Sequence, residues 1–284
     1  MALNNVLKSL FISLFPVLAL YLSIRSGLSL VEQFDLSTAG LFIMAMTVVI
    51  LFAMIFIKKM ARGYGNLRPY EIFLLSGLVL FLIGYFQGEK TTTDLIGVVA
   101  LLLAWVGYSR WYSTFPKREQ ELLRVGQTLP AFEIEDIDRN KITEKTLLGQ
   151  KNLLLFFRGN WCPLCMAQLK EVVEEYQELE ALGVETYMIS PQPPSHSISL
   201  SRKHKVNFHY LVDKGNAMAK RFKIFAKNGL PMGLQVLGYD SDTVLPTVLV
   251  TDEQGKIIFA DLTDNYRVRP EPSTFLDIIR QHGS

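Results

Sequence analysis

Residues 151–169 read KNLLLFFRGNWCPLCMAQL, and this stretch decides the fold of the second half of the chain. It opens with an apolar run, Leu153–Phe157, which has the length and composition of a buried strand. Both cysteines of the sequence, Cys162 and Cys165, follow at a C-x-x-C spacing. Apolar residues then recur at helical spacing to about Leu182, which places the cysteines at a predicted strand-to-helix junction.

Cys162 is predicted to begin this helix. The free backbone N–H groups and the positive end of the macrodipole at a helix N-terminus favour a thiolate, which is the reactive form of cysteine. Cys165, one turn further on, could then close a disulfide. We interpret Cys162 and Cys165 as the catalytic residues of a redox-active pair that needs no further cofactor.

Three alternatives compete with redox chemistry: an inert structural disulfide, half of a zinc site, and two buried thiols. Zinc normally needs two more Cys or His ligands. The four histidines of the chain do not form a ligand pair at the required spacing, so we predict no metal site; they are His196, His204, His209 and His282. A module that holds copper, a haem precursor or a partner protein, with His196 or His204 as a third ligand, is the non-enzymatic alternative.

The composition indicates two domains. The 284 residues are 49% hydrophobic, which is high for a soluble protein, and the excess lies before about residue 115. A net charge of only +2, with no basic patch among aromatic residues, argues against a nucleic-acid partner. Two cysteines provide no disulfide framework, and one C-x-x-C pair is compatible with either a reducing or an oxidising compartment.

Four apolar stretches predict a transmembrane helical domain over residues 1–111, followed by a linker over 112–124. They cover about 6–24, 36–57, 72–88 and 95–108, and the second contains 22 residues without a charge. The fourth stretch is short, and needs an aromatic belt at the membrane interface formed by Trp105, Tyr108, Trp111 and Tyr112. No ionisable residue lies in the middle of a stretch, which indicates an anchor rather than a transport pathway.

The distribution of lysine and arginine predicts the orientation. One side carries nine basic residues: Lys8, Lys58, Lys59, Arg62, Arg68, Arg110, Lys117, Arg118 and Arg124. The opposite loops carry two, Arg25 and Lys90. We therefore predict a multi-pass protein of the cell (inner) membrane with both termini, and hence the cysteine pair, in the cytoplasm. The prediction depends on an even number of spans; an odd number would place the pair on the other side.

Residues 125–284 alternate between predicted strands and helices. The expected strands after the motif are Val184–Ile189, Phe208–Val212, Val244–Val250 (with Pro246 near its start) and Lys256–Ala260, and the expected helices are Ser197–Lys205, Ala217–Phe225 and Ser273–Gln281. Asp136–Lys141 is predicted to form a hairpin turn. This order predicts an α/β three-layer sandwich with a central mixed sheet.

Several pieces of this half resemble the thioredoxin-fold peroxiredoxin-like family, the alkyl hydroperoxide reductase and thiol-specific antioxidant group. They are Gly126–Phe132, Phe156–Cys165, Leu211–Lys214, Leu245–Thr247 and Tyr266–Pro272. The resemblance covers about residues 125–284, a little over half of the chain. The membrane half resembles no family that we recognise.

The resemblance implies a role for five residues. Cys162 matches the nucleophilic cysteine and Cys165 the second cysteine of the thioredoxin pair, while Trp161 matches the tryptophan of that motif. Pro246 matches the cis-proline that faces the disulfide. Arg269, or as a second choice Arg267, matches the arginine that polarises peroxide. Apart from the resemblance, Arg158 is the nearest charged group in the motif, and it could either lower the thiol pKa or be a solvated arginine beside a turn.

The chain also departs from the family. Leu155 and Gly159 stand where peroxiredoxins have proline and threonine, and Phe156 stands where thioredoxins have a buried aspartate. We therefore predict a membrane-anchored enzyme, a thiol-disulfide oxidoreductase or a thiol-dependent peroxidase, with the choice left open. Its expected partners are a peroxide or a protein disulfide, an external thiol reductant of the thioredoxin or glutathione kind, and membrane lipid.

Overall fold

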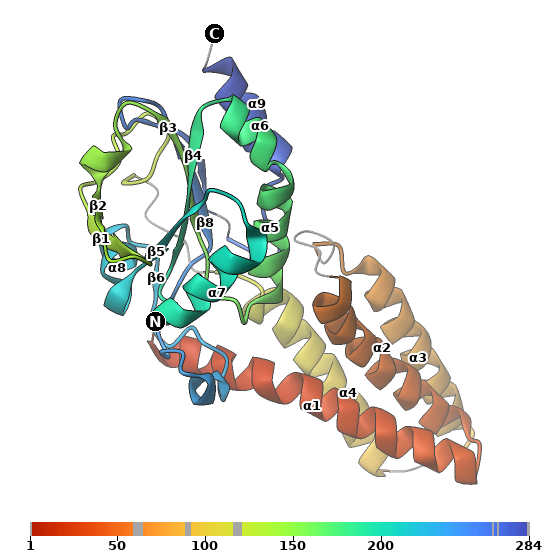
Figure 1. Cartoon of the computed structure of the whole chain (residues 1–284). Coiled ribbons are helices and arrows are strands. Elements are labelled where there is room, and N and C mark those ends of the chain that lie inside the picture. The colour runs from red at the N-terminus through yellow and green to blue at the C-terminus, as the bar shows by residue number, and fades with distance from the viewer. Residues whose placement is uncertain are drawn as a thin grey trace. The chain divides into compact units, whose positions relative to one another are not determined.

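The computed structural model of the protein describes residues 2–58, 65–88, 92–115, 121–262, 264–265 and 267–282. The chain divides into two compact units (Figure 1), one of Leu10–Thr114 and one of Met1–Ser9 with Phe115–Ser284. The domain boundaries 1–111, 112–124 and 125–284 stay a prediction. Six residues used in the sequence arguments lie outside the described residues: Lys59, Arg62, Lys90, Lys117, Arg118 and Tyr266.

Four long helices form the first unit and the start of the chain. They are α1 (Ala2–Glu32), α2 (Leu36–Lys58), α3 (Arg68–Phe86) and α4 (Thr92–Val106), and the π-helix η1 (Gly107–Tyr112) continues α4. By length and composition all four could cross a membrane. The fourth stretch is longer than the sequence suggested, because α4 and η1 together give 21 residues over Thr92–Tyr112.

Two glycines allow α2 and α3 to approach closely. A Cβ atom built on Gly77 would lie 2.7 Å from the carbonyl oxygen of Gly40. Small residues at a helix contact permit this backbone approach inside a membrane, where the hydrophobic effect does not drive helices together.

Part of the predicted aromatic belt is wrong. Tyr108 is fully buried and Trp105 is 7% exposed. The ring of Tyr108 lies 5.5 Å from that of Phe52 and 6.0 Å from that of Phe15. These two side chains pack inside the helical unit because α4 continues into η1, which moves the end of the helix beyond them.

An ion pair joins two of the helices. Arg25, which we expected in a loop, lies within α1 because that helix continues to Glu32. Its Nη2 atom lies 2.5 Å from Oδ1 of Asp94, which is buried in the first turn of α4. A buried carboxylate needs such a partner, since a lone charge in this environment is costly.

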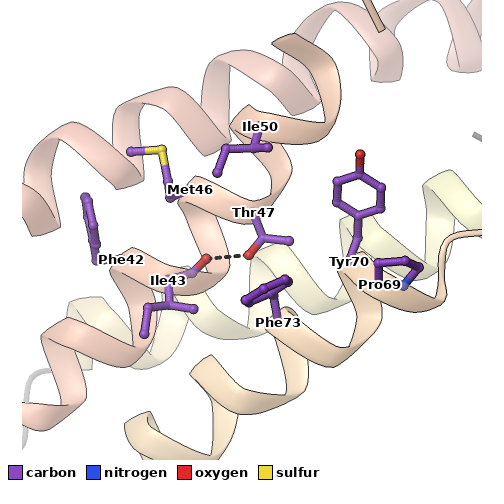
Figure 2. A pocket seen from close by; sticks show the side chains of 8 residues that line it. All are labelled: Phe42, Ile43, Met46, Thr47, Ile50, Pro69, Tyr70 and Phe73. Atoms are coloured by element: carbon purple, nitrogen blue, oxygen red, sulfur yellow. Dashed lines mark hydrogen bonds between the residues drawn. The ribbon is translucent and has the colours of Figure 1, made fainter. Parts of the chain in front are cut away.

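An apolar groove of about 380 Å³ lies between α2 and α3 (Figure 2). Its lining residues are Phe42, Ile43, Met46, Thr47, Ile50, Pro69, Tyr70 and Phe73. The hydroxyl of Thr47 donates to the carbonyl oxygen of Ile43, at 2.7 Å, one turn back in its own helix. Apart from the Tyr70 hydroxyl, the groove therefore presents almost no polar side-chain group of its own to an occupant.

The second unit contains a seven-stranded mixed sheet, which confirms the predicted fold class. The strand order is β2-β1-β5-β4-β3-β8-β9, and β3, β4 and β5 run parallel while the other pairs are antiparallel. The strands are β1 (Glu133–Asp136), β2 (Lys141–Thr143), β3 (Lys151–Phe156), β4 (Val184–Ser190), β5 (His209–Val212), β8 (Thr247–Thr251) and β9 (Ile257–Asp261). A separate ribbon pairs β6 (Phe225–Ala226) with β7 (Thr243–Val244).

Helices cover both faces of this sheet. They are α5 (Pro163–Glu174), α6 (Tyr176–Ala181), α7 (Pro194–His204), α8 (Ala217–Arg221) and α9 (Pro272–Gln281). On one face Phe222, next to α8, packs on Phe156 of β3, with 5.8 Å between their rings. Phe275 of α9 packs on Phe259 of β9, at 6.2 Å, on the opposite face. Burial of such aromatic side chains supplies much of the stability of a core.

Three predicted elements are shorter than expected. The motif helix breaks at Glu175, so α5 and α6 replace one continuous helix. Helix α8 ends at Arg221 because Lys223 adopts a positive φ of 57°, which helical backbone does not permit. The strand around Pro246 divides into β7 and β8, since proline has no N–H with which to continue a ladder.

Candidate active site

Strand β3 positions the cysteine motif at the centre of the sheet. Phe156, its last residue, pairs with Ile189 of β4 on one side and Thr247 of β8 on the other. The loop that follows depends on Gly159, which has φ = +141°. A Cβ atom at this position would lie 2.7 Å from Cδ1 of Trp161. The residue that replaces the threonine of peroxiredoxins is therefore required here by the backbone and by the tryptophan.

The two cysteines meet at the N-terminus of α5, as the sequence predicts. Cys162 is the N-cap, and its Sγ accepts a hydrogen bond from the backbone N–H of Cys165 at 3.4 Å. The two Sγ atoms lie 2.8 Å apart, and both thiols are free. Cys162 is 4% exposed and Cys165 is fully buried. The geometry is that of a reduced pair in which Cys162 lies nearer to solvent.

The thiols titrate as a pair. Burial raises the pKa of Cys162 well above its usual value, and the hydrogen bond with Cys165 adds to this effect. Burial also acts to raise the pKa of Cys165, but its hydrogen bond with Cys162 and the charge of Arg269 outweigh burial and lower this pKa to about 6. The pair therefore loses its first proton near pH 6 and its second far above it.

The single negative charge is best placed on Cys162. Proton transfer between two sulfurs only 2.8 Å apart can move the charge from one to the other. The Cys165 N–H points at the sulfur of Cys162, and the macrodipole of α5 favours an anion at the same end. Cys162 is also the more exposed sulfur, so the charge on it is the one that a substrate can reach.

Two arginines supply positive charge to the pair. The charges of Arg158 and Arg269 lower the pKa of both cysteines. Arg269 is 2% exposed, and its Nη1 donates to the carbonyl oxygen of Val268 at 2.8 Å. Its Nε and Nη2 atoms have no hydrogen-bond partner among the described residues. Both donors are buried beside the cysteine pair, on whose pKa the charge of Arg269 acts.

Arg158 is held in place rather than freely solvated. Its Nη2 donates to the carbonyl oxygen of Gly229, and its guanidinium carbon lies 4.7 Å from the centre of the Trp161 ring. The backbone oxygen of Arg158 accepts from the hydroxyl of Thr243 at 3.2 Å. The arginine thus fixes both the tryptophan and the segment that follows β6.

Pro246 lies immediately before β8, next to the end of β3, as the resemblance implies. The prediction of a cis peptide bond before Pro246 is wrong, because the described residues contain no cis peptide bond. The trans form is the ordinary preference of a bond before proline. Here the chain direction is already set by the hydrogen bond from Leu245 N–H to the carbonyl oxygen of Ile224, at 2.7 Å, and by the start of β8.

A polar cluster around Asn160 was not predicted. The Asn160 side chain accepts from the hydroxyl of Tyr239 and lies 3.5 Å from Nδ1 of His196. The rings of His196 and Tyr239 stack at 4.8 Å and 11°. The buried side chain of Gln192 accepts from the Asn160 N–H at 2.9 Å. The partners lie 32 to 79 residues away in sequence, so no local pattern reveals them.

The metal-binding alternative gains no support from the described part of the chain. It contains no group of three or more His, Cys, Asp or Glu side chains that could hold a metal ion. His196, one of the two histidines considered as a third ligand, stacks on Tyr239. That the cysteine pair works without a cofactor stays a prediction.

The match to a family model covers the whole cysteine site except Arg269. Residues 125–260 match the model of the AhpC/TSA family. Residues 125–260 form an AhpC/TSA family domain. The resemblance found in the sequence is therefore confirmed, and Cys162 and Cys165 lie within the AhpC/TSA domain.

Curated relatives of this domain are named as thiol enzymes. The chain is 24% identical over 162 residues to the thiol-disulfide oxidoreductase ResA of Bacillus thuringiensis, covering 57% of this chain and 82% of the relative. It is 23% identical over 158 residues to a protein named as a peroxiredoxin, bcp, of Haemophilus influenzae, covering 56% of this chain and 97% of the relative. The prediction of an oxidoreductase agrees with both names.

Solved structures with a similar fold include the peroxidoxin BcpB of Mycobacterium tuberculosis. This match has a TM-score of 0.46 and 17% identity, and covers 56% of this chain and 97% of that structure. The AhpC of Enterococcus faecalis matches with a TM-score of 0.45 and 17% identity, covering 56% of this chain and 96% of that structure.

Proposed function

We propose that the chain is a membrane-anchored thiol oxidoreductase in which Cys162 is the nucleophile and Cys165 resolves the intermediate. The observation that carries the proposal is the pair of free thiols, 2.8 Å apart, at the N-terminus of α5. The AhpC/TSA domain and the names of its relatives support the same class of chemistry. The four apolar helices support the anchor.

Disulfide exchange is the reaction that this geometry supports best. The Cys162 thiolate attacks one sulfur of a substrate disulfide, forms a mixed disulfide and releases the other sulfur as a thiolate. Cys165 then attacks Cys162, forms the intramolecular disulfide and releases the second substrate thiol. Two electrons pass from the pair to the substrate, and an external thiol reductant of the thioredoxin or glutathione kind returns them. The short distance between the two sulfurs favours the second step.

Peroxide reduction is the second candidate, and Arg269 is the observation that favours it. Its two buried donors, which have no hydrogen-bond partner among the described residues, could bind a peroxide oxygen beside the thiols. Cys162 would then attack the other oxygen, giving a sulfenic acid and an alcohol or water, and Cys165 would condense with the sulfenic acid and release water.

Substitution of the second cysteine separates the two reactions. In Cys165→Ser the intermediate on Cys162 cannot be resolved, so it should accumulate in a single turnover. We expect a mixed disulfide after reaction with a disulfide substrate, and a sulfenic acid after reaction with hydrogen peroxide. Mass spectrometry of the intact chain distinguishes the two adducts. Absence of both adducts would contradict the assignment of Cys162 as the nucleophile.

The reactivity of the reduced pair should depend on pH. Because the pair loses its first proton near pH 6, alkylation of the full chain by iodoacetamide should be near its maximum at pH 7.5. Below pH 6 the rate should fall about tenfold per pH unit as the thiolate is protonated. An ordinary cysteine, with its pKa near 8.5, would still gain rate strongly between pH 7 and pH 8.5. Such a rise would contradict the lowered pKa.

The localisation follows from the helices and the basic residues. We propose that the four helices cross the cell (inner) membrane, so that both termini and the cysteine pair lie in the cytoplasm. Support comes from the length of the fourth helix, which at 21 residues is sufficient for an even number of spans. Among the basic residues on the opposite side, Arg25 pairs with the buried Asp94 and adds little free charge to that side.

A further inference from the structure

The hairpin β6–β7 carries an apolar tip. Phe225 pairs with Val244 and Ala226 with Thr243, and the chain between these strands, 227–242, projects as a loop. At its end the 3-10 helix η4 (Leu234–Leu237) is bounded by two glycines with positive φ, Gly233 at 98° and Gly238 at 85°. These backbone conformations, which favour glycine, give the tip a defined shape rather than that of an open coil.

Three large apolar side chains at this tip are exposed. The exposed fractions are 48% for Met232, 86% for Val236 and 58% for Leu237. Between residues 121 and 282, described apart from 263 and 266, the other large apolar side chains this exposed are Val125 and Leu148, which lie apart from each other in the sequence. Single exposed apolar residues are ordinary, but a cluster on one turn marks a surface that meets another phase or molecule.

Basic residues precede the tip. Lys220, Arg221, Lys223 and Lys227 are all exposed within eight residues of sequence. The ammonium of Lys220 lies 4.9 Å from the centre of the Phe225 ring in β6, so positive charge reaches the base of the hairpin. The acidic residues of the other leg are Asp240 and Asp242, and a carboxylate oxygen of Asp242 accepts from the N–H of Asn228. Exposed apolar residues beside lysine and arginine are typical of segments that bind an anionic bilayer surface.

The short segment that joins the last apolar helix to the α/β unit also favours a bilayer as the surface that the tip binds. The last apolar helix ends at Tyr112, and Leu123 already belongs to the core of the α/β unit. A chain of about eleven residues reaches roughly 40 Å at most. If the helices span a membrane, as proposed above, the α/β unit is held at its surface, and one of its faces must lie toward the lipid.

The hairpin is connected to the cysteine site. The Tyr239 hydroxyl donates to the side chain of Asn160, two residues before Cys162. The carbonyl oxygen of Gly229 accepts from Arg158, and the hydroxyl of Thr243 donates to the backbone of Arg158. A surface bound through this hairpin therefore lies on the side of the unit that carries the cysteine motif.

We propose that the tip of the β6–β7 hairpin, with Met232, Val236 and Leu237, inserts into the interface of an anionic bilayer and holds the cysteine site at the membrane surface. The inference rests on the proposed membrane anchor but not on the proposed redox chemistry. It adds a second attachment, made by the α/β unit itself, to the four helices.

The test uses the full chain reconstituted into phosphatidylcholine and phosphatidylglycerol vesicles with or without brominated acyl chains. Leu237→Trp reports on the tip. Leu148→Trp is the matched control, because Leu148 is similarly exposed but lies before β3, at the end opposite to the cysteine motif. Both variants retain the native Trp105, Trp111 and Trp161, so the difference from the unsubstituted chain isolates the new residue.

We expect the bromolipid to reduce the emission of the residue at 237 by about twofold or more and to leave that at 148 almost unchanged. Addition of Val236→Glu should weaken quenching at 237. Equal quenching at both positions would overturn the proposal. Protection of position 237 from aqueous iodide without quenching by bromolipid would also overturn it, and would indicate a protein or a second copy of the chain on the tip. Flotation of the chain with the vesicles tests the proposed membrane anchor separately, and alkylation of the cysteines tests the proposed redox chemistry.

Discussion

Cys162→Ser should abolish turnover with either class of substrate, lowering the rate on the order of a thousandfold or more. A serine hydroxyl stays protonated near neutral pH and does not attack a disulfide or a peroxide without a base beside it. The remaining Cys165 is fully buried and cannot replace Cys162 at the surface. The measurement is a stopped-flow rate for the reduced full chain with hydrogen peroxide and with a peptide disulfide, followed by tryptophan fluorescence.

The structure of this variant should be preserved. Cys162 occupies the N-cap of α5, a position that serine favours, so the hydroxyl can accept the N–H of Cys165 as the sulfur does. An unchanged thermal unfolding curve would therefore accompany the loss of activity. Turnover retained in the folded variant would contradict both proposed reactions, because each begins at the Cys162 sulfur.

Local patterns in the sequence predicted the elements that carry the site. The apolar run at Leu153–Phe157 lies in β3 except for its last residue, and the helical spacing after Cys162 corresponds to α5 and α6, because strand and helix periods are local properties. The boundaries that failed depend on single backbone angles. Lys223 at φ = 57° ends α8 early, and no feature of the sequence distinguishes it from a helical lysine.

Contacts between segments that are distant in sequence were harder to predict. The resemblance to a family indicated Arg269, and the structure adds that it is buried and that its charge acts on both thiols. The cluster of Asn160 with Gln192, His196 and Tyr239 joins the motif loop, the segment from β4 into α7, and the β6–β7 hairpin. Such polar residues are common in loops, so only the packing of the sheet shows that these lie together.

Arg269→Met should raise the pKa of the cysteine pair above about 6 and slow its reaction below neutral pH. The reason is the loss of a positive charge that lowers the pKa of both thiols. An increase of one unit lowers the thiolate fraction at pH 6 from about one half to about one eleventh, so we expect the rate of alkylation at pH 6 to fall about fivefold. Since the thiolate returns as the pH rises, the rate at pH 9 should approach that of the unsubstituted chain. The measurement is the rate against pH for both chains.

Two further variants separate the effect of charge from that of burial. Arg267→Met removes another buried arginine, 6% exposed, but the charges that lower the pKa of the thiols are those of Arg158 and Arg269. Its pH profile should therefore stay unchanged.

Arg269→Lys keeps the charge and loses the planar set of donors, so it should retain much of the lowered pKa yet react more slowly with hydrogen peroxide. Methionine at 269 should not unfold the chain, because replacing a buried charge that lacks full hydrogen bonding by an apolar side chain of similar length is often neutral or stabilising. An unchanged pH profile in a folded Arg269→Met chain would show that the lowered pKa comes from the helix N-terminus, the neighbouring thiol and Arg158, without a contribution from Arg269.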